Sequence, residues 1–193
     1  MESMQVLSGG IGIVAYGLLI IALFRTKTEQ SFAAFLLWAL LDLIAAVTTI
    51  IADGNYWMAL ANAIGSAVIT ILLIIKKQVS WSWVESMTAA LVVICLIVWY
   101  AAGEQAGIIA SSLAVVIASV PQMVETYKKP EVTPTFIYLV FLAAYIVSLI
   151  AGKAWTIEER FYPCCSIFLC SVIVIFSVRK KVMSYLHKRF KII

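Results

Sequence analysis

The stretch YWMALANAIGSAVITILLIIKK, residues 56–77, decides the fold class of this chain. It runs from Tyr56 to Ile75 without a charged side chain and then ends on Lys76 and Lys77. A helix needs about 20 mainly apolar residues to cross the hydrocarbon core of a bilayer. The stretch therefore predicts one membrane-spanning helix over residues 56–75.

Similar apolar runs recur along the whole chain. They predict seven membrane helices over residues 8–24, 33–52, 56–75, 86–103, 106–127, 135–153 and 161–178. Of the 193 residues, 64% are hydrophobic and only 12% are charged, whereas a soluble domain carries about 25% charged residues. The chain has too little polar surface to coat a soluble globule, so we expect an all-α membrane protein that crosses the bilayer seven times.

The Lys and Arg residues predict the orientation of the helices, because basic residues accumulate in cytoplasmic loops. One side of the predicted membrane carries Arg25, Lys27, Lys76, Lys77, Lys128, Lys129, Arg179, Lys180, Lys181, Lys188, Arg189 and Lys191. The other side carries only Lys153 and Arg160. This places the N-terminus outside and the C-terminus in the cytoplasm. It also explains the net charge of +4 by topology rather than by nucleic-acid binding.

The N-terminal residues Met-Glu-Ser-Met lack the positive region of a secretory signal, so we expect the first apolar run to stay as a membrane helix. The expected location is the inner (plasma) membrane of a cell, as a multi-pass protein.

Sliding the chain by 104 residues superposes the first three predicted helices on the last three without a gap. Matched pairs include Arg25 with Lys129, Phe32 with Phe136, Ala39 with Ala143, and Lys76 and Lys77 with Lys180 and Lys181. Chance is the alternative, since apolar helices resemble one another. The interpretation divides the chain into a three-helix repeat (1–79), a linker helix (80–104), a second three-helix repeat (105–182) and a basic cytoplasmic tail (183–193). A single linker helix makes the repeats parallel, an arrangement in which transporters bind substrate at the repeat interface.

A second motif lies at the end of the fifth predicted helix. The segment SVPQMVETYKK, residues 119–129, places the pair Pro121-Gln122 before a basic loop, and PEVTPTF follows at 130–136. This pattern resembles the PQ-loop family, which includes the SWEET sugar transporters. The segment around Asn62, ANAIGS at 61–66, also looks like the third helix of SWEETs, where an Asn faces the sugar pocket. The resemblance implies a 3+1+3 parallel-repeat bundle that moves a small polar solute by alternating access.

The sequence departs from the SWEET pattern where the second pocket Asn would lie. Pro163-Cys164 stands in place of a Pro-Asn pair, and the repeat places Ser166 opposite Asn62. The solute therefore stays open: a sugar or a similar small polar molecule, carried passively or with protons. A vitamin-precursor carrier resembling the nicotinamide riboside permeases, which share the three-one-three layout, is the alternative within transporters.

Two polar residues inside apolar runs are the main candidates for the site. Asp42 lies near the middle of 33–52, where a carboxylate costs about 2.5–3.5 kcal/mol. It should face the bundle interior, either for proton coupling or substrate contact or as a structural acid bonded to a neighbouring helix. Asn62 offers both donors and an acceptor, which suits a polar solute, although interhelical hydrogen bonding is the usual role of such an Asn.

Further candidates are weaker. Trp38, Tyr145, Ser148, Cys164 and Ser166 are expected to line the rest of the pocket. Pro121 removes one backbone hydrogen bond and should kink its helix, so Pro121 and Gln122 are predicted to form a hinge, with a static kink as the alternative.

Other function classes find less support in the sequence. Cys95, Cys164, Cys165 and Cys170 lie inside apolar runs, and the single histidine, His187, lies in the basic tail. We therefore expect no cofactor, metal or catalytic residue, and no enzyme activity. A retinal protein is disfavoured because the last predicted helix has no lysine between Cys164 and Val178. A seven-helix receptor that binds without transport stays open, as does a homo-oligomer; the expected partners are a small polar solute and the lipid bilayer.

Overall fold

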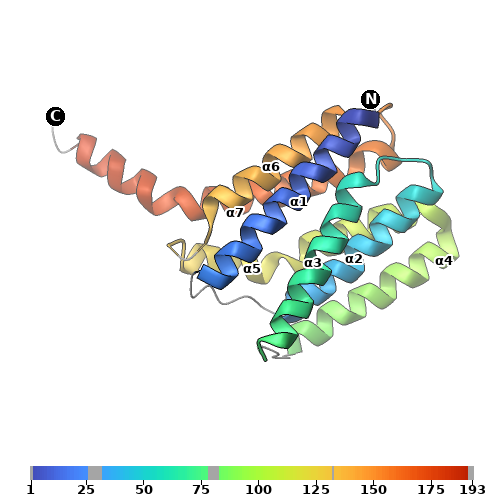
Figure 1. Ribbon diagram of the computed structural model, residues 1–193, viewed down its shortest axis with the longest axis horizontal. Coiled ribbons are helices and arrows are strands. Elements are labelled where there is room, and N and C mark those ends of the chain that lie inside the picture. Colours follow the sequence, from blue (N-terminus) through green and yellow to red (C-terminus); the bar gives the residue numbers. More distant parts are fainter. Residues whose placement is uncertain (1, 26–31, 78–82, 132, 191–193) are drawn as a thin grey trace.

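The computed structural model describes residues 2–25, 32–77, 83–131 and 133–190, and these are helical with short connections and no strand. Figure 1 shows the bundle that they form. Its helices are α1 (Glu2–Arg25), α2 (Phe32–Ile51), α3 (Trp57–Ile75), α4 (Trp83–Ala118), α5 (Val120–Lys128), α6 (Thr135–Ile150) and α7 (Ile157–Phe190). Lys27 and Lys191 lie outside the described residues, as do the side chains from residue 181 onward.

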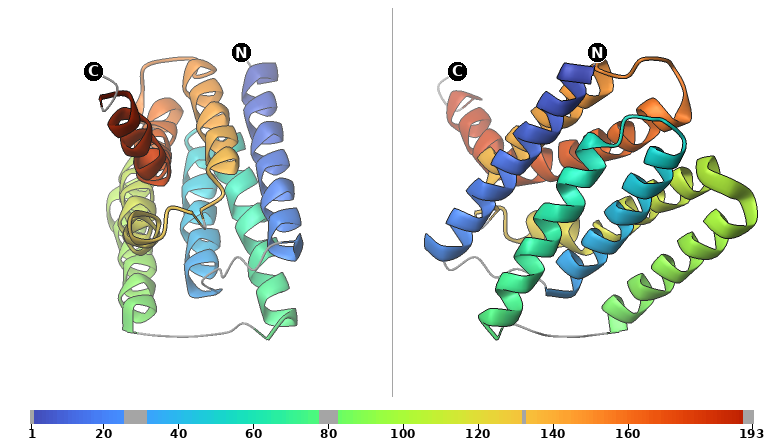
Figure 2. Two further views of the ribbon diagram at one scale, coloured as in Figure 1. Left: turned by 90° about the vertical axis from the view of Figure 1, so that its left-hand side faces the viewer. Right: turned by 45° about the vertical axis from the view of Figure 1, so that its right-hand side comes forward.

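Helix α4 contains a reversal of the chain. Gly103, with φ 82° and ψ −173°, is not helical, and this backbone conformation is one that glycine adopts without the strain of a side chain. Figure 2 shows the chain turning back on itself there, so that α4 consists of two arms. The turn falls where the sequence predicted the end of the linker helix.

Contacts between the helices fix their neighbours in the bundle. Helix α3 lies against both α1 and α2, and α7 lies against α4, α5 and α6. Helix α1 also lies against α6, and α2 lies against α4. The two views of Figure 2 show these helices packed side by side.

The basic side chains at helix ends bind backbone carbonyls that the helices leave without partners. Lys76 donates to the carbonyl of Leu23 at 3.0 Å and lies 4.0 Å from the centre of the Phe24 ring. Arg179 donates to the carbonyl of Tyr127 and lies 3.6 Å from the centre of that ring. These contacts tie the end of α3 to α1 and α7 to the end of α5.

Close helix packing depends on a glycine in α3. A Cβ at Gly65 would overlap the ring of Tyr16 in α1, so the absence of a side chain lets the two helices approach. The hydroxyl of Tyr16 also forms a hydrogen bond with Ser66 at 2.9 Å. These contacts join α1 to α3.

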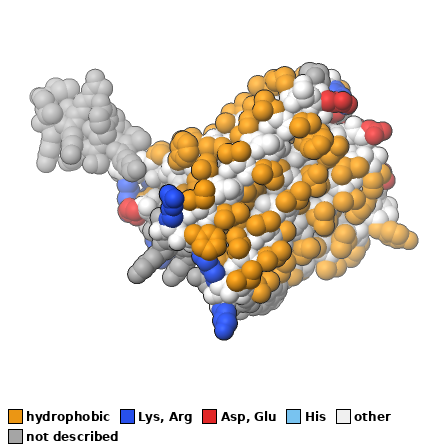
Figure 3. Space-filling model, viewed as in Figure 1, with side chains coloured by type: hydrophobic (Ala, Val, Ile, Leu, Met, Phe, Trp, Pro, Cys, Tyr) orange, Lys and Arg blue, Asp and Glu red, His pale blue; other side chains and the backbone are white. Residues whose placement is uncertain are grey.

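The outer surface is that of a membrane protein. Five of the described helices are long and apolar enough to cross a bilayer, and α6 is a shorter apolar helix of 16 residues. Figure 3 shows hydrophobic side chains spread over the face, with most of the acidic groups at the upper right and most of the basic groups at the lower left. Glu2 and Asp53 lie together at one end of the bundle with Lys153, and Glu158 contacts Gly54 there. Lys153 and Glu2 form an ion pair of 3.4 Å.

The kink expected near Pro121 is present as a one-residue irregularity. Helix α4 ends at Ala118 and α5 begins at Val120, so the irregularity falls at Ser119, two residues before Pro121. Ser119 keeps helical dihedrals, with φ −88° and ψ −8°. Its N–H donates to the carbonyl of Val115 at 3.0 Å, and its carbonyl accepts from the N–H of Met123 at 3.0 Å. The chain therefore bends at Ser119 and continues into α5, as expected where a proline removes one backbone donor.

Candidate functional site

Four buried side chains from four helices form a hydrogen-bonded network at the bundle centre. The Nδ2 of Asn62 donates to the hydroxyl of Tyr145 at 2.6 Å and to the hydroxyl of Tyr162 at 2.5 Å. The Tyr162 hydroxyl donates in turn to Oδ1 of Asp42 at 2.9 Å. These residues come from α2, α3, α6 and α7, so the network joins four helices through side chains.

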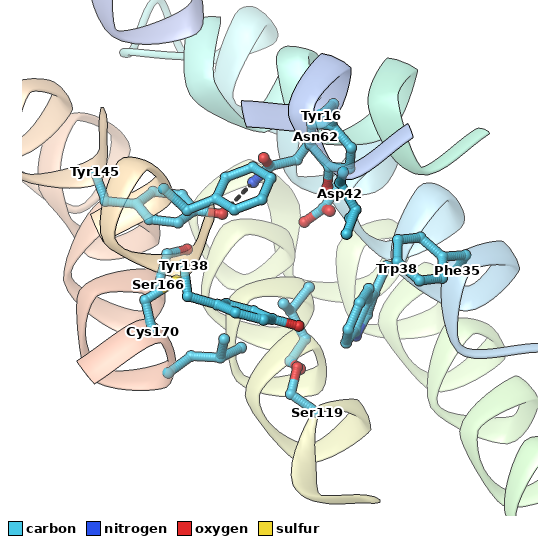
Figure 4. A pocket seen from close by; sticks show the side chains of 14 residues that line it. Tyr16, Phe35, Trp38, Asp42, Asn62, Ser119, Tyr138, Tyr145, Ser166 and Cys170 are labelled. Atoms are coloured by element: carbon cyan, nitrogen blue, oxygen red, sulfur yellow. Dashed lines mark hydrogen bonds between the residues drawn. The ribbon is translucent and has the colours of Figure 1, made fainter. Parts of the chain in front are cut away.

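A cavity of about 50 Å³ lies beside this network, between α1, α2, α3, α4, α6 and α7 and the residue that separates α4 from α5. It is smaller than the pockets of about 300–1,000 Å³ that enclose larger ligands. Figure 4 shows its side chains converging from several helices. The lining consists of Tyr16, Leu19, Phe35, Trp38, Asp42, Asn62, Val115, Ser119, Tyr138, Phe141, Tyr145, Ser166, Leu169 and Cys170.

Most of the pocket residues proposed from the sequence lie in this lining. The structure brings together Asn62, Asp42, Trp38, Tyr145 and Ser166. The Ser166 hydroxyl donates to the carbonyl of Tyr162 one turn earlier, at 3.0 Å. Their contact with a solute stays a prediction.

Two of the proposed pocket residues lie elsewhere. Ser148 is buried one turn beyond Tyr145, where its carbonyl and hydroxyl accept from Nδ2 of Asn55 at 2.9 and 3.2 Å. That contact joins α6 to the connection between α2 and α3. Cys164 is exposed on the outside of α7, because it lies two residues, or about 200° of helix rotation, from Tyr162. Neither residue lines the cavity.

The sequence analysis missed Tyr162, although its hydroxyl connects Asp42 to Asn62. It also missed the aromatic side chains of Tyr16, Phe35, Tyr138 and Phe141. A signal was present for Tyr162, since a tyrosine beside Pro163 inside an apolar run needs a partner for its hydroxyl. The others are aromatic residues of apolar helices, which the sequence does not separate from lipid-facing ones.

Two polar atoms of the lining residues have no hydrogen-bond partner among the described residues. They are Oδ1 of Asn62, an acceptor, and Nε1 of Trp38, a donor, and both atoms are buried. Buried polar groups are nearly always paired in folded proteins. The unpaired atoms therefore mark hydrogen-bonding capacity at the centre of the bundle.

The predicted hinge lies next to the cavity. Ser119, at the kink between α4 and α5, lines the cavity, and its hydroxyl donates to the carbonyl of Val115 at 2.7 Å. Pro121 follows in the first turn of α5. The Nε2 of Gln122 forms a long hydrogen bond of 3.4 Å to the hydroxyl of Thr126. The kink thus places a change of helix direction beside the candidate site.

Beyond α5, the connection to α6 carries an ion pair with the end of α7. Lys180 donates to Oε1 of Glu131 at 2.7 Å. This hydrogen bond lowers the pKa of the Glu131 carboxyl below its ordinary value. The pair is exposed, so it contributes little to stability.

A second cavity of about 460 Å³ opens at the acidic end of the bundle. It lies against α1, α2, the start of α3 and the loop after α6, and its lining includes Glu2, Gln5, Asp53, Tyr56, Trp57 and Lys153. The Tyr56 and Trp57 rings are stacked with centres 5.0 Å apart.

No group of three or more His, Cys, Asp or Glu residues that could hold a metal ion occurs within the described part of the chain. Comparisons with models of known protein families, with curated proteins and with solved structures find no match for this chain.

Proposed function

We propose that this protein is a membrane carrier that moves a small polar solute by alternating access, as a facilitator or coupled to protons. The observation that carries the proposal is the hydrogen-bonded network of Asp42, Tyr162, Asn62 and Tyr145 beside a central cavity. Polar and ionisable side chains inside a membrane bundle are costly and usually mark a solute or ion pathway.

The proposed architecture is a seven-crossing bundle of two parallel triples. The first triple is α1, α2 and α3, and the second is formed by the second arm of α4 with α5, then α6 and α7; the first arm of α4 is the linker. In each triple the third helix lies between the other two. In each, a basic residue near the end of the third helix binds a carbonyl near the end of the first: Lys76 with Leu23, and Arg179 with Tyr127. Leu23 and Tyr127 are separated by the 104 residues of the sequence repeat, so packing and sequence support the same relation.

The proposed orientation keeps the N-terminus outside the cell and the basic end in the cytoplasm. It is supported by the separation of the acidic and basic groups toward opposite ends of the bundle (Figure 3). Lys76 and Arg179, which bind helix-end carbonyls, would lie at the cytoplasmic surface, as the preference of basic residues for that side requires.

The network provides a mechanism for alternating access. Asn62 in the first triple forms hydrogen bonds with Tyr145 and Tyr162 in the second. These bonds hold the triples together at the level of the cavity. A solute that offers its own hydrogen bonds to the same groups would replace them, which allows the triples to separate on one side. The kink at Ser119 and Pro121 lies where the second triple would bend.

The proposal is tested by a thermal-shift screen of purified protein against sugars, amino acids and nucleosides, followed by uptake into proteoliposomes. Binding raises the unfolding temperature in proportion to affinity and concentration. The expected result is a stabilising solute whose effect is lost in Asn62→Ala. The matched control is Asn55→Ala, which removes a buried amide outside the cavity and should keep the ligand-dependent shift.

Two results would contradict the proposal. One is a ligand that binds through Asn62 but never enters proteoliposomes, which would favour a receptor. The other is the absence of stabilisation and of uptake with every class, which would leave the network with a structural role only.

A further inference from the structure

The cavity contains a buried carboxyl group, that of Asp42, without a basic partner. Asp42 is 3% exposed, and none of the residues that line the cavity is Lys, Arg or His. Among the described residues no ion pair reaches Asp42, and its described hydrogen bond comes from the neutral hydroxyl of Tyr162. Buried charges in proteins are ordinarily paired. The site is therefore suited to a positively charged ligand.

Aromatic rings form much of the remaining wall. The lining includes Tyr16, Phe35, Trp38, Tyr138, Phe141 and Tyr145. Edge-to-face contacts fix two ring pairs, Phe35 with Trp38 at 5.0 Å and Tyr16 with Phe141 at 4.9 Å between centres. The faces of such rings attract cations, most strongly those of Trp.

A metal ion fits this wall poorly. Calcium and magnesium need several oxygen ligands around one point, and the lining offers a single carboxylate. Rings beside one carboxylate suit a polyatomic cation, whose positive charge is spread over a larger, partly apolar head. Figure 4 shows Trp38 and Tyr138 reaching toward one another below Asp42 and Asn62.

We infer that the solute is a small organic cation, an ammonium or guanidinium compound, whose charged head binds between Asp42 and the rings of Trp38 and Tyr138. The inference rests on the proposed function and specifies its substrate class. The unpaired Oδ1 of Asn62 is an acceptor for an N–H of the head. The unpaired Nε1 of Trp38 is a donor for a hydroxyl or carbonyl elsewhere on the solute.

The acidic end of the bundle supports the same class of solute. The cavity of about 460 Å³ at that end is lined by Glu2 and Asp53, with Lys153 already paired to Glu2 at 3.4 Å. An excess of negative charge at an entrance raises the local concentration of cations. The stacked Tyr56 and Trp57 rings add aromatic surface at this end.

The test measures binding to the purified full-length protein of three pairs of compounds, each a cation and a neutral molecule of similar shape. The pairs are choline with dimethylbutanol, its uncharged carbon isostere, ethanolamine with ethylene glycol, and guanidinium with urea. At least one cation should bind about tenfold more tightly than its neutral partner, as one favourable cation–aromatic contact provides. The preference should be lost in Asp42→Asn, which keeps an acceptor for Tyr162, and retained in Asp42→Glu.

The control variant is Glu125→Gln, which removes an exposed carboxylate of α5 away from the cavity and should keep the preference. The inference is overturned if no cation binds more tightly than its neutral partner, or if the preference survives in Asp42→Asn. Uptake of the probes and of neutral solutes into proteoliposomes separates the two proposals. Uptake of neutral solutes alone would contradict the organic-cation inference and agree with the carrier proposal. Asp42-dependent cation binding without uptake would contradict the carrier proposal and agree with the cation site.

Discussion

Replacing Tyr162 by Phe removes one oxygen atom from the centre of the bundle. That oxygen accepts from Asn62 at 2.5 Å and donates to Asp42 at 2.9 Å, so the substitution breaks both bonds and leaves a carboxylate oxygen without its described donor. Hydrogen bonds between membrane helices contribute about 0.6 kcal/mol on average and at most about 1.7 kcal/mol. Two of them predict a loss of about 1–3 kcal/mol in the free energy of unfolding.

The measurement is reversible unfolding in mixed detergent micelles, followed by circular dichroism. Tyr138→Phe is the matched control, because Tyr138 lines the same cavity and its hydroxyl has no described hydrogen bond; it should change stability by less than about 0.5 kcal/mol. A double-mutant cycle with Asp42→Asn should show a coupling of about 0.5 kcal/mol or more. Equal stabilities of the Tyr162→Phe and Tyr138→Phe proteins would refute the network.

Three other predictions concern packing, helix ends and topology. Gly65→Ala should destabilise the protein by about 1–3 kcal/mol, because the added methyl group overlaps Tyr16. Gly17 has open space beside it, so Gly17→Ala should leave the stability unchanged in the same unfolding assay. Arg179→Met should lower the free energy of unfolding by about 0.5–1.5 kcal/mol, because it leaves the Tyr127 carbonyl without this donor. The neighbouring substitution Lys180→Met should lower it less, since its ion pair is exposed. Equal losses in the two variants would contradict this prediction. In a background without the native cysteines, an impermeant maleimide should label Lys153→Cys on intact cells and Lys77→Cys only after permeabilisation, and the reverse pattern would overturn the orientation.

Helix positions were predictable because an apolar run of sufficient length has no other solution in a bilayer. The run at 33–52 became α2, Phe32–Ile51, and the run at 56–75 became α3, Trp57–Ile75. The ends of α1 and α7 were predicted too short, at residues 8 and 178. Both helices continue through polar residues, to Glu2 and Phe190, which a hydrophobicity criterion does not include.

The polar centre was predictable in part. Asp42 and Asn62 were identified because each is expensive in an apolar helix, and the structure buries both at the cavity. When a helix is apolar on all sides, its sequence does not show which side faces the interior of the bundle. Ser148 and Cys164 were therefore assigned to the pocket on chemistry alone. Ser148 lies one turn too far along α6, and Cys164 lies on the opposite side of α7 from Tyr162.

The bonds from Asn62 to Tyr145 and Tyr162 also set a kinetic expectation for the proposed carrier. An empty carrier would have to break both bonds without compensation before it could reorient, whereas a loaded one would exchange them for bonds to its cargo. The return of the empty form should then be the slow half of the cycle. Cargo on the far side of the membrane should accelerate the movement of labelled cargo from the near side, so that exchange outpaces net flux.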